Sequence, residues 1–178
     1  MNGPRVRHPP LPRLLAGLAA LAGCAPALPP SAPSASLERP IAFSAPDERG
    51  DLTRVPSAGA RATILELWAT SCEPCRAALP PLAAEAPALA RDGIELVLVS
   101  VLESGEPLDR AQATLRSWGV GRGFVVDRGG GVQRLLGADR LPATLVLDRH
   151  GLVRWVAPPG AAASAVAAAA RKVASSRL

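Results

Sequence analysis

Apolar residues fall in short runs, separated by turn-forming residues, over most of the chain after residue 40. The runs Ala62–Trp68 (ATILELW) and 94–101 (IELVLVSV) are nearly continuous, which predicts strands that are buried on both faces and lie parallel. Between them, over 74–91, apolar residues recur at helical spacing and predict a helix with one buried face. The further elements predicted are a hairpin of strands 41–44 and 52–55, a helix over 108–118, a strand over 124–127, a helical turn over 132–136, strands over 143–148 and 152–156, and a helix over 161–173.

The order of these elements predicts an α/β fold. Strands and helices alternate in the middle of the chain, and a β-hairpin and a last helix follow. This order favours a mixed β-sheet flanked by helices, with an N-terminal β-hairpin added. A length of 178 residues suits one domain with a leader and a linker. Hydrophobic residues make up 48% of the chain and aromatic residues only 3%, so the core must consist mainly of aliphatic side chains.

The N-terminus has the pattern of an export signal. Arg5, Arg7 and Arg13 precede an apolar run over 14–23. This run is shorter than the roughly 20 residues that a membrane-spanning helix needs, and it has the length of a signal-peptide core. We therefore predict a signal peptide over residues 1–23.

The predicted signal peptide ends at a cysteine. The sequence LAGC at 21–24 resembles the bacterial lipobox, in which the cysteine is lipidated and becomes the new N-terminus. The alternative is an ordinary signal peptide, with Cys24 a free thiol. Ala25 is not the aspartate of the inner-membrane retention signal, so the anchor is assigned to neither the inner nor the outer membrane. Residues 24–40, rich in Pro, Ala and Ser, predict a semi-extended tether to a domain over 41–178.

The charge of the chain does not indicate a nucleic-acid partner. The formal net charge is +5, but three of the 20 basic residues lie in the leader. Without them, 17 basic residues stand against 15 acidic ones and are scattered along the sequence. We therefore expect no nucleic acid among the partners.

Three cysteines set the candidate chemistry: Cys24 in the leader, and Cys72 and Cys75 with two residues between them. A structural disulfide framework would need more cysteines, more widely spread. Two thiols and the separate histidines His8 and His150 do not form a zinc-ligand pattern. We expect no metal, and no cofactor other than a redox-active disulfide between Cys72 and Cys75.

The sequence Cys72-Glu73-Pro74-Cys75 lies where an apolar strand turns into a helix. At the first turn of a helix, residues i and i+3 share one face, so the two thiols come within disulfide range. The unpaired N–H groups and the helix dipole favour the thiolate of Cys72, which is the nucleophilic form, and Pro74 suits this first turn. We predict that Cys72 attacks and Cys75 resolves, while Glu73 opposes the thiolate and so favours a reductant.

CEPC and two further features resemble the thioredoxin superfamily, and within it the membrane-anchored TlpA-like and ResA-like proteins. Pro80 follows the second cysteine by five residues, where thioredoxins have a helix-kinking proline. LPAT at 141–144, followed by LVLDRHG, resembles the cis-proline loop. The resemblance covers about residues 41–173 and implies a thioredoxin-like fold. It also implies that Pro142 abuts the disulfide in the cis form and that Pro142 and Leu141 bind the substrate.

The resemblance further implies an exported thiol–disulfide oxidoreductase at the periplasmic face of a bacterial membrane. Family members often reduce disulfides of apocytochrome c to thiols, or reduce other disulfide-containing exported proteins, with electrons from a membrane thiol donor. Three residues depart from the family pattern. Ser71 replaces a tryptophan, Leu141 replaces a Thr or Val, and Ala78 stands where some ResA-like members have a glutamate linked with their specificity.

Glu66 is an acidic residue within the apolar strand ATILELW. An unpaired charge is costly to bury there. Thioredoxins have an aspartate at the matching position that exchanges protons with the resolving thiol, so the resemblance implies this role for Glu66 toward Cys75. A buried carboxyl with a raised pKa suits it. The alternative is that Glu66 points to a wet edge or pairs with an arginine.

Other functions of the cysteine pair are left open by the residues alone. One is an inert structural disulfide, although a bridge across two residues gains little loop entropy. A thiol peroxidase of the same fold needs Thr or Ser three residues before its cysteine, where this chain has Ala69. A copper chaperone needs a wider cysteine spacing and a histidine ligand. The last alternative is a non-enzymatic, membrane-anchored interaction module that carries thiols. Turnover of a disulfide substrate would distinguish an enzyme from such a module.

Overall fold

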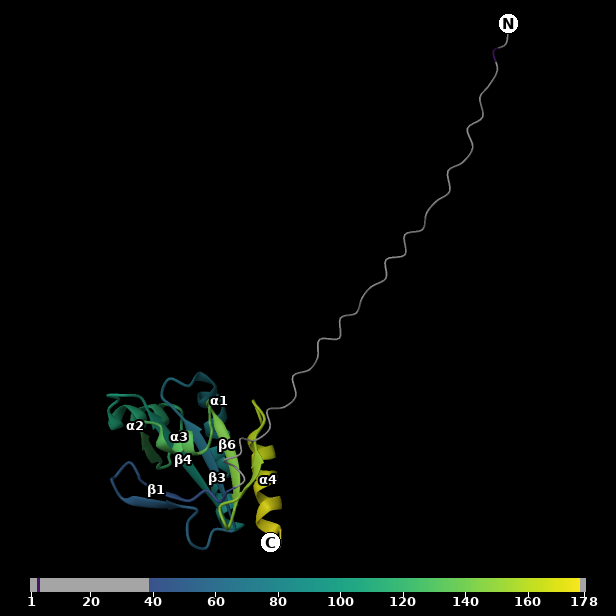
Figure 1. Ribbon diagram of the computed structural model, residues 1–178. Coiled ribbons are helices and arrows are strands. Elements are labelled where there is room, and N and C mark those ends of the chain that lie inside the picture. Colours follow the sequence, from purple (N-terminus) through teal and green to yellow (C-terminus); the bar gives the residue numbers. More distant parts are fainter. Residues whose placement is uncertain (1–2, 4–38, 177–178) are drawn as a thin grey trace. The chain divides into compact units, whose positions relative to one another are not determined.

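The computed structural model describes Gly3 and residues 39–176 of the chain (Figure 1). The predicted signal peptide, the predicted lipidation site Cys24 and the predicted tether up to residue 38 lie outside the described residues. None of the helices in the described part combines the length and the apolar character that crossing a bilayer requires. The fold described below is therefore that of residues 39–176.

A five-stranded mixed sheet forms the centre of this region, in the order β5-β4-β3-β6-β7. β3 (Ala62–Trp68) pairs in parallel with β4 (Ile94–Leu102) and antiparallel with β6 (Ala143–Asp148). β5 (Val125–Arg128) and β7 (Val153–Val156) form the two edges. All seven residues of β3 are buried, which explains its nearly continuous apolar sequence. The predicted mixed sheet is confirmed.

Three helices cover one face of the sheet. Trp68 lies on this face, and its ring makes edge-to-face contacts with Trp118 and Phe124 at centroid distances of 5.6 Å. Because the chain has few aromatic residues, aliphatic side chains of the helices fill the rest of this core. The helices are α1 (Glu73–Arg91), α2 (Leu108–Ser117) and α4 (Ala163–Ser175), and their buried residues include Leu79, Leu82, Leu115 and Val166.

The opposite face is covered by the N-terminal hairpin and one short helix. Their apolar residues pack on the alternate side chains of the central strands, such as Leu65 and Val97. The hairpin is a separate two-stranded antiparallel sheet, as predicted. These elements are β1 (Phe43–Pro46), β2 (Leu52–Val55) and α3 (Gly131–Leu135).

α1 contains three prolines beyond its first turn, Pro80, Pro81 and Pro87. A proline has no N–H to donate to the carbonyl four residues earlier, so each one removes a hydrogen bond from the helix. Leu79 and Leu89, which are fully buried, pack this helix against the sheet. The stability of α1 therefore comes from tertiary packing more than from its own backbone.

The first strand of the hairpin lies two residues later than predicted, at 43–46 in place of 41–44. The carboxylate of Asp47 accepts N–H hydrogen bonds from Arg49 (2.8 Å) and Asp51 (2.9 Å), and this turn fixes the register of the hairpin. The other predicted elements agree with the structure to within two residues at each end. This turn at Asp47 therefore moves the first strand two residues along from its predicted position.

The two ends of the sheet differ in what they carry. The carboxyl ends of β3 and β4 lead into the segments 69–72 and 103–107, which precede α1 and α2. The turn 149–152 between β6 and β7 lies at the opposite end, because Asp148 pairs with Ala62, the first residue of β3. The predicted cysteine motif therefore lies at one end of the domain and this turn at the other.

Candidate functional site

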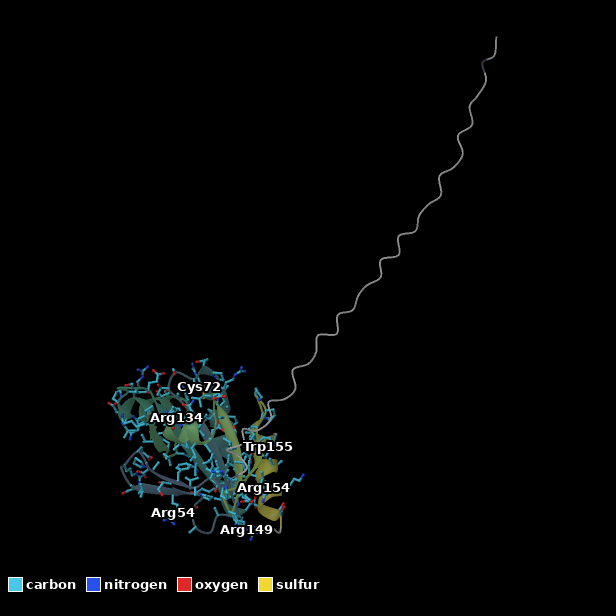
Figure 2. The ribbon with its side chains drawn as sticks, in the orientation of Figure 1. Arg54, Cys72, Arg134, Arg149, Arg154 and Trp155 are labelled. Carbon is cyan, nitrogen blue, oxygen red and sulfur yellow. A yellow bond between two sulfur atoms is a disulfide. The ribbon has the colours of Figure 1, made fainter. Side chains whose placement is uncertain are left out.

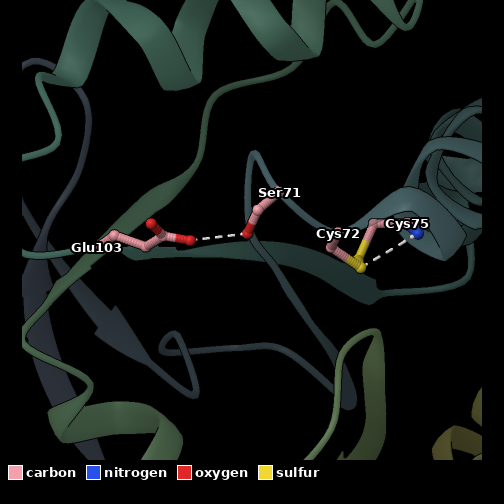
Figure 3. Close-up of a disulfide and its surroundings, with 4 residues drawn as sticks. All are labelled: Ser71, Cys72, Cys75 and Glu103. Atoms are coloured by element: carbon pink, nitrogen blue, oxygen red, sulfur yellow. Dashed lines mark hydrogen bonds between the residues drawn. A yellow bond between two sulfur atoms is a disulfide. The ribbon is translucent and has the colours of Figure 1, made fainter.

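Cys72 and Cys75 form a disulfide at the start of α1 (Figure 3). Their Cα atoms lie 5.3 Å apart, and the Cys72 Sγ accepts the backbone N–H of Cys75 at 3.2 Å. Cys72 caps the helix, so the N–H groups and the positive end of the helix dipole face its sulfur. Cys72 is 9% exposed and Cys75 is fully buried. This difference fits an attacking Cys72 and a resolving Cys75.

Glu73 and Pro74 occupy the first turn of α1, and both are exposed. Pro74 lies where the helix needs no N–H donor, as predicted from the sequence. Glu73 places a carboxylate directly after Cys72. A negative charge there acts against the helix dipole in its effect on a Cys72 thiolate.

Glu66 lies in the middle of β3, on the face of that strand that also carries Trp68 and faces the core cluster containing Cys75. It is 1% exposed, and no arginine pairs with it among the residues described. Burial raises the pKa of Glu66 to about 7, although a hydrogen bond with the Thr144 side chain acts to lower it. Its second carboxylate oxygen has no protein partner. The wet-edge and arginine-paired alternatives are therefore wrong, while proton transfer to or from Cys75 stays a prediction.

Leu141 and Pro142 lie at the cysteine end of the sheet. The next residue, Ala143, pairs with Leu67 near the carboxyl end of β3. The Leu141–Pro142 peptide bond is cis, and the Leu141 side chain packs against the cluster that contains both cysteines. The structure thus places this loop at the same end as Cys72, where the resemblance implies substrate binding.

Two glutamates between β4 and α2 accept hydrogen bonds from the segment before Cys72. Neither was predicted from the sequence. The Ser71 hydroxyl donates to the Glu103 carboxylate at 2.8 Å (Figure 3), and the Thr70 hydroxyl donates to the Glu106 carboxylate at 2.5 Å. Glu106 also accepts the N–H of Glu103 at 3.1 Å. The side chain of Glu106 is only 4% exposed, and its carboxylate lies 3.8 Å from the guanidinium of Arg110. Ser71, noted above only as a departure from a family pattern, is one of the donors.

One signal in the sequence points to this pair of glutamates. The carboxyl ends of neighbouring parallel strands meet at one edge of a sheet, so polar residues that directly follow them come together. Thr70 and Ser71 follow β3, and Glu103 follows β4. Among Gly3 and residues 39–176, no three His, Cys, Asp or Glu side chains form a group suited to a metal ion. The chemistry that this end of the sheet offers is that of the two thiols.

Comparisons with known proteins agree with this arrangement. The chain is 28% identical over 114 residues to the thiol-disulfide oxidoreductase ResA of Geobacillus thermodenitrificans and 26% identical to that of Geobacillus kaustophilus. Each match covers 64% of this chain, and the chain spans 64% of the length of each of these relatives.

Solved structures show the same fold. StoA from Bacillus subtilis matches with a TM-score of 0.64 and 20% identity, over 74% of this chain and 98% of that chain. A thiol:disulfide interchange protein of the thioredoxin family from Chlorobium tepidum matches with a TM-score of 0.63 and 20% identity, over 76% and 97%. The lipoprotein thioredoxin Etrx1 from Streptococcus pneumoniae matches with a TM-score of 0.62 and 18% identity, over 74% and 99%. The predicted thioredoxin-like fold is confirmed.

The family follows from a match to a family model. The model of the AhpC/TSA family matches residues 38–156, which include both cysteines, Glu66 and Pro142. This match extends over more than half of the chain and over the whole central sheet. The protein therefore belongs to the AhpC/TSA family of thioredoxin-like proteins.

Proposed function

We propose that this protein is an exported thiol–disulfide oxidoreductase that exchanges disulfides with protein substrates through Cys72 and Cys75. The observation that carries the proposal is the geometry of the pair: Cys72 caps α1 and reaches the surface, while Cys75 is buried one turn behind it. The relatives named thiol-disulfide oxidoreductase support it. An inert bridge has no need of a sulfur at a helix N-terminus, where thiolates are stabilised.

The reaction proceeds through a mixed disulfide. The Cys72 thiolate of the reduced protein attacks one sulfur of a substrate disulfide, and the other substrate sulfur leaves as a thiolate and takes up a proton. Cys75 then loses its proton, with Glu66 as the acceptor, and attacks the Cys72 sulfur. The substrate leaves as a dithiol, and the protein retains the Cys72–Cys75 disulfide. Two electrons have passed from the protein to the substrate.

We assign the direction as reduction. Glu73 follows Cys72 directly, and the Glu103 carboxylate is bound to Ser71, the residue before it. Negative charge around Cys72 disfavours its thiolate and so favours the oxidised form of the pair, which is the property of a reductant. A membrane thiol donor restores the dithiol. Disulfide-containing exported proteins, including apocytochrome c, are the substrates we propose from the family resemblance.

The proposed location is the periplasmic face of a bacterial membrane, with a lipid on Cys24. The support is the LAGC sequence that ends a basic and then apolar leader. A structural neighbour, Etrx1, is itself named an exposed lipoprotein thioredoxin. The Pro-, Ala- and Ser-rich residues 24–40 give the domain a tether to the membrane.

A trapping experiment tests the roles of the thiols. Cys75→Ser lacks the resolving thiol, so it accumulates a mixed disulfide with a peptide disulfide through Cys72. Cys72→Ser, the matched control, forms almost none, because the remaining Cys75 is buried. Non-reducing mass spectrometry measures both adducts. Equal trapping by the two variants, or none by either, contradicts the assignment.

Turnover assays of the purified wild-type protein distinguish the proposed reductase from the alternative functions. The wild type is expected to reduce insulin disulfides over many cycles with a dithiol reductant. A thiol peroxidase would instead turn over hydrogen peroxide, for which Ala69 offers no hydroxyl beside the cysteine. A binding module would turn over neither substrate.

A further inference from the structure

Basic side chains gather at the end of the domain opposite the cysteines. Arg54, Arg61, Arg149 and His150, all exposed, line one surface hollow of about 510 Å³ together with the segment 56–60. These four residues, called the basic end below, lie far apart in the sequence. The fold thus brings together four basic residues that the sequence keeps apart or in separate segments.

The topology explains this gathering. Arg54 belongs to β2, and Arg61 directly precedes β3. Arg149 and His150 form the β6–β7 turn, which lies at the first residue of β3 through the pairing of Asp148 with Ala62. Figure 2 shows Arg54 and Arg149 near each other at the end of the domain away from Cys72.

The turn that carries Arg149 and His150 is firmly built. The Asp148 carboxylate accepts the N–H groups of His150 (2.8 Å) and Leu152 (3.0 Å), and its other oxygen accepts from the Arg154 guanidinium at 2.7 Å. Burial acts to raise the pKa of Asp148, but these hydrogen bonds lower it below its usual value. The charge of Asp148 is therefore balanced by Arg154 and does not cancel the basic end.

Few other acidic groups face the basic end. Asp92, at the end of α1, is paired with Arg171 at 2.8 Å. Glu95, the second residue of β4, is half-buried. At the cysteine end, the exposed Glu73 and Glu103 are accompanied by exposed arginines, Arg76 and Arg140, so charges of both signs are mixed there. The basic end differs from the cysteine end in having few exposed acidic groups of its own.

The chain also enters the domain at the basic end. The backbone N–H of Ile41 donates to the carbonyl of Gly151, in the β6–β7 turn, at 2.8 Å. The approach is so close that a Cβ on Gly151 would lie 2.3 Å from the Ile41 carbonyl oxygen. Ile41 is therefore fixed next to the turn that carries Arg149 and His150. A tether that begins at a lipidated Cys24 joins the domain at this place.

We propose that the basic end docks on an anionic phospholipid surface, so that the cysteines face away from the membrane toward their substrates. The proposal adds an orientation to the exported, lipid-anchored reductase proposed above and rests on its location. Arginines near an anionic bilayer are each worth about fivefold in binding, and the attraction weakens as salt is added.

Vesicle flotation of the full chain carrying Cys24→Ala tests this docking. The variant lacks the proposed covalent lipid, and the measurement involves no redox turnover. Vesicles of phosphatidylcholine alone are compared with vesicles that also contain phosphatidylglycerol. We expect binding to the mixed vesicles that falls about 25-fold or more in Arg54→Glu/Arg61→Glu. The control Arg76→Glu/Arg140→Glu makes the same change in net charge at the cysteine end and is expected to bind like the parent. All variants keep the same leader, so differences between them report on the domain.

The proposal is overturned if the protein binds both kinds of vesicle equally, or if both double variants lose binding equally. It is also overturned if inorganic phosphate displaces the protein from the vesicles more than sodium chloride of equal ionic strength does. Binding to duplex DNA as strong as binding to the mixed vesicles is the fourth outcome that overturns it. The milder Arg54→Gln/Arg61→Gln replaces the charge reversal if circular dichroism shows that the latter is unfolded. Failure here leaves the redox function untouched, because thiol trapping measures that separately.

Discussion

At the scale of single residues, Glu66 shows most directly how burial sets chemistry. Its carboxyl lies in the central strand with one oxygen unpartnered, and desolvation raises its pKa to about 7. A group with that pKa takes up and releases protons at neutral pH, which a surface glutamate does not do. Glu66 lies between Ile64 and Trp68, whose side chains belong to the core cluster that contains Cys75, and we propose that it receives the proton of Cys75.

Glu66→Gln is expected to slow the resolution of the mixed disulfide and to leave the first attack by Cys72 nearly unchanged. The glutamine keeps the shape and the polarity but accepts no proton. In the wild type, the resolution rate should rise with pH through about 7, as the carboxylate forms, and this rise should be absent from the variant. Rapid-quench trapping at a series of pH values measures the two steps. Identical pH profiles would make Glu66 a structural residue.

The same substitution changes how stability depends on pH. Because the folded pKa of about 7 exceeds the ordinary value of 4.5, the folded state holds the proton more tightly than the unfolded state. Protonated Glu66 makes its full contribution to the free energy of unfolding below pH 4.5, its ordinary pKa. That contribution falls by ~3 kcal/mol as the pH rises to the folded pKa of about 7. Urea unfolding of the glutamine variant should lack this component.

The sequence predicts residues whose role depends on their local pattern. Cys72 and Cys75 are recognised by their spacing at a strand–helix junction, and Glu66 by its apolar neighbours. Glu103 and Glu106 are not recognised, because their partners Ser71 and Thr70 lie 32 and 36 residues away. Such pairs become visible only when the order of the strands is known.

At the scale of elements, the site is made where two loops meet. The segment after β3 and the segment after β4 are joined by the hydroxyl of Thr70 and the buried carboxylate of Glu106. A hydrogen bond to a buried charge is worth about 1.5–3 kcal/mol, more than an ordinary one. The backbone that leads into Cys72 is thus fixed by a loop from the neighbouring strand.

Thr70→Val and Glu106→Gln are expected to slow the attack of Cys72 on a peptide disulfide and to alter the pH dependence of Cys72 alkylation. Their effects on the free energy of unfolding should be non-additive by about 1–3 kcal/mol, since they remove one shared contact. Ser71→Ala is the matched comparison, because its bond to Glu103 is exposed and should matter less. Additive effects, with an unchanged alkylation profile, would show that the contact does not position Cys72.

Elements are predicted well where their own sequence decides them. β3 and β6 have the predicted bounds, because each is a short apolar run next to turn residues. The hairpin is shifted because the turn at Asp47 sets its register and because Ile41, which the prediction placed in the first strand, bonds instead to Gly151, more than 100 positions later. The helix α4 begins at Ala163 and not at residue 161, and its alanine-rich sequence marks no sharper boundary.

At the scale of the whole molecule, the lipid that we propose on Cys24 decides where the chemistry takes place. Expressed in a bacterium that processes lipoproteins, the full chain should enter the detergent phase and incorporate labelled fatty acid. Cys24→Ala should abolish both, because Cys24 is the proposed acceptor of the lipid. Phase partition and label incorporation are measured on the same cultures, with Cys75→Ser as the control that should keep both. A wild-type protein that stays in the aqueous phase would show that the lipobox assignment is wrong.

The architecture of the whole domain is the part that the sequence predicts best, since the alternation of apolar runs reports the order of strands and helices. The charge distribution is the part it predicts least. The basic residues are spread along the chain, and only the antiparallel return of β6 beside β3 brings Arg149 next to Arg61.

The prolines of α1 have a consequence for the chain before it folds. With three prolines inside the helix besides Pro74 in its first turn, the segment that follows Cys72 forms no stable helix in an extended chain, because too few of its backbone hydrogen bonds are available. The helix terminus that activates the thiol therefore exists only after Leu79 and Leu89 have packed on the sheet. An unfolded chain therefore carries ordinary, weakly reactive cysteines. In the exported reductase that we propose, exchange with other thiols begins only with folding.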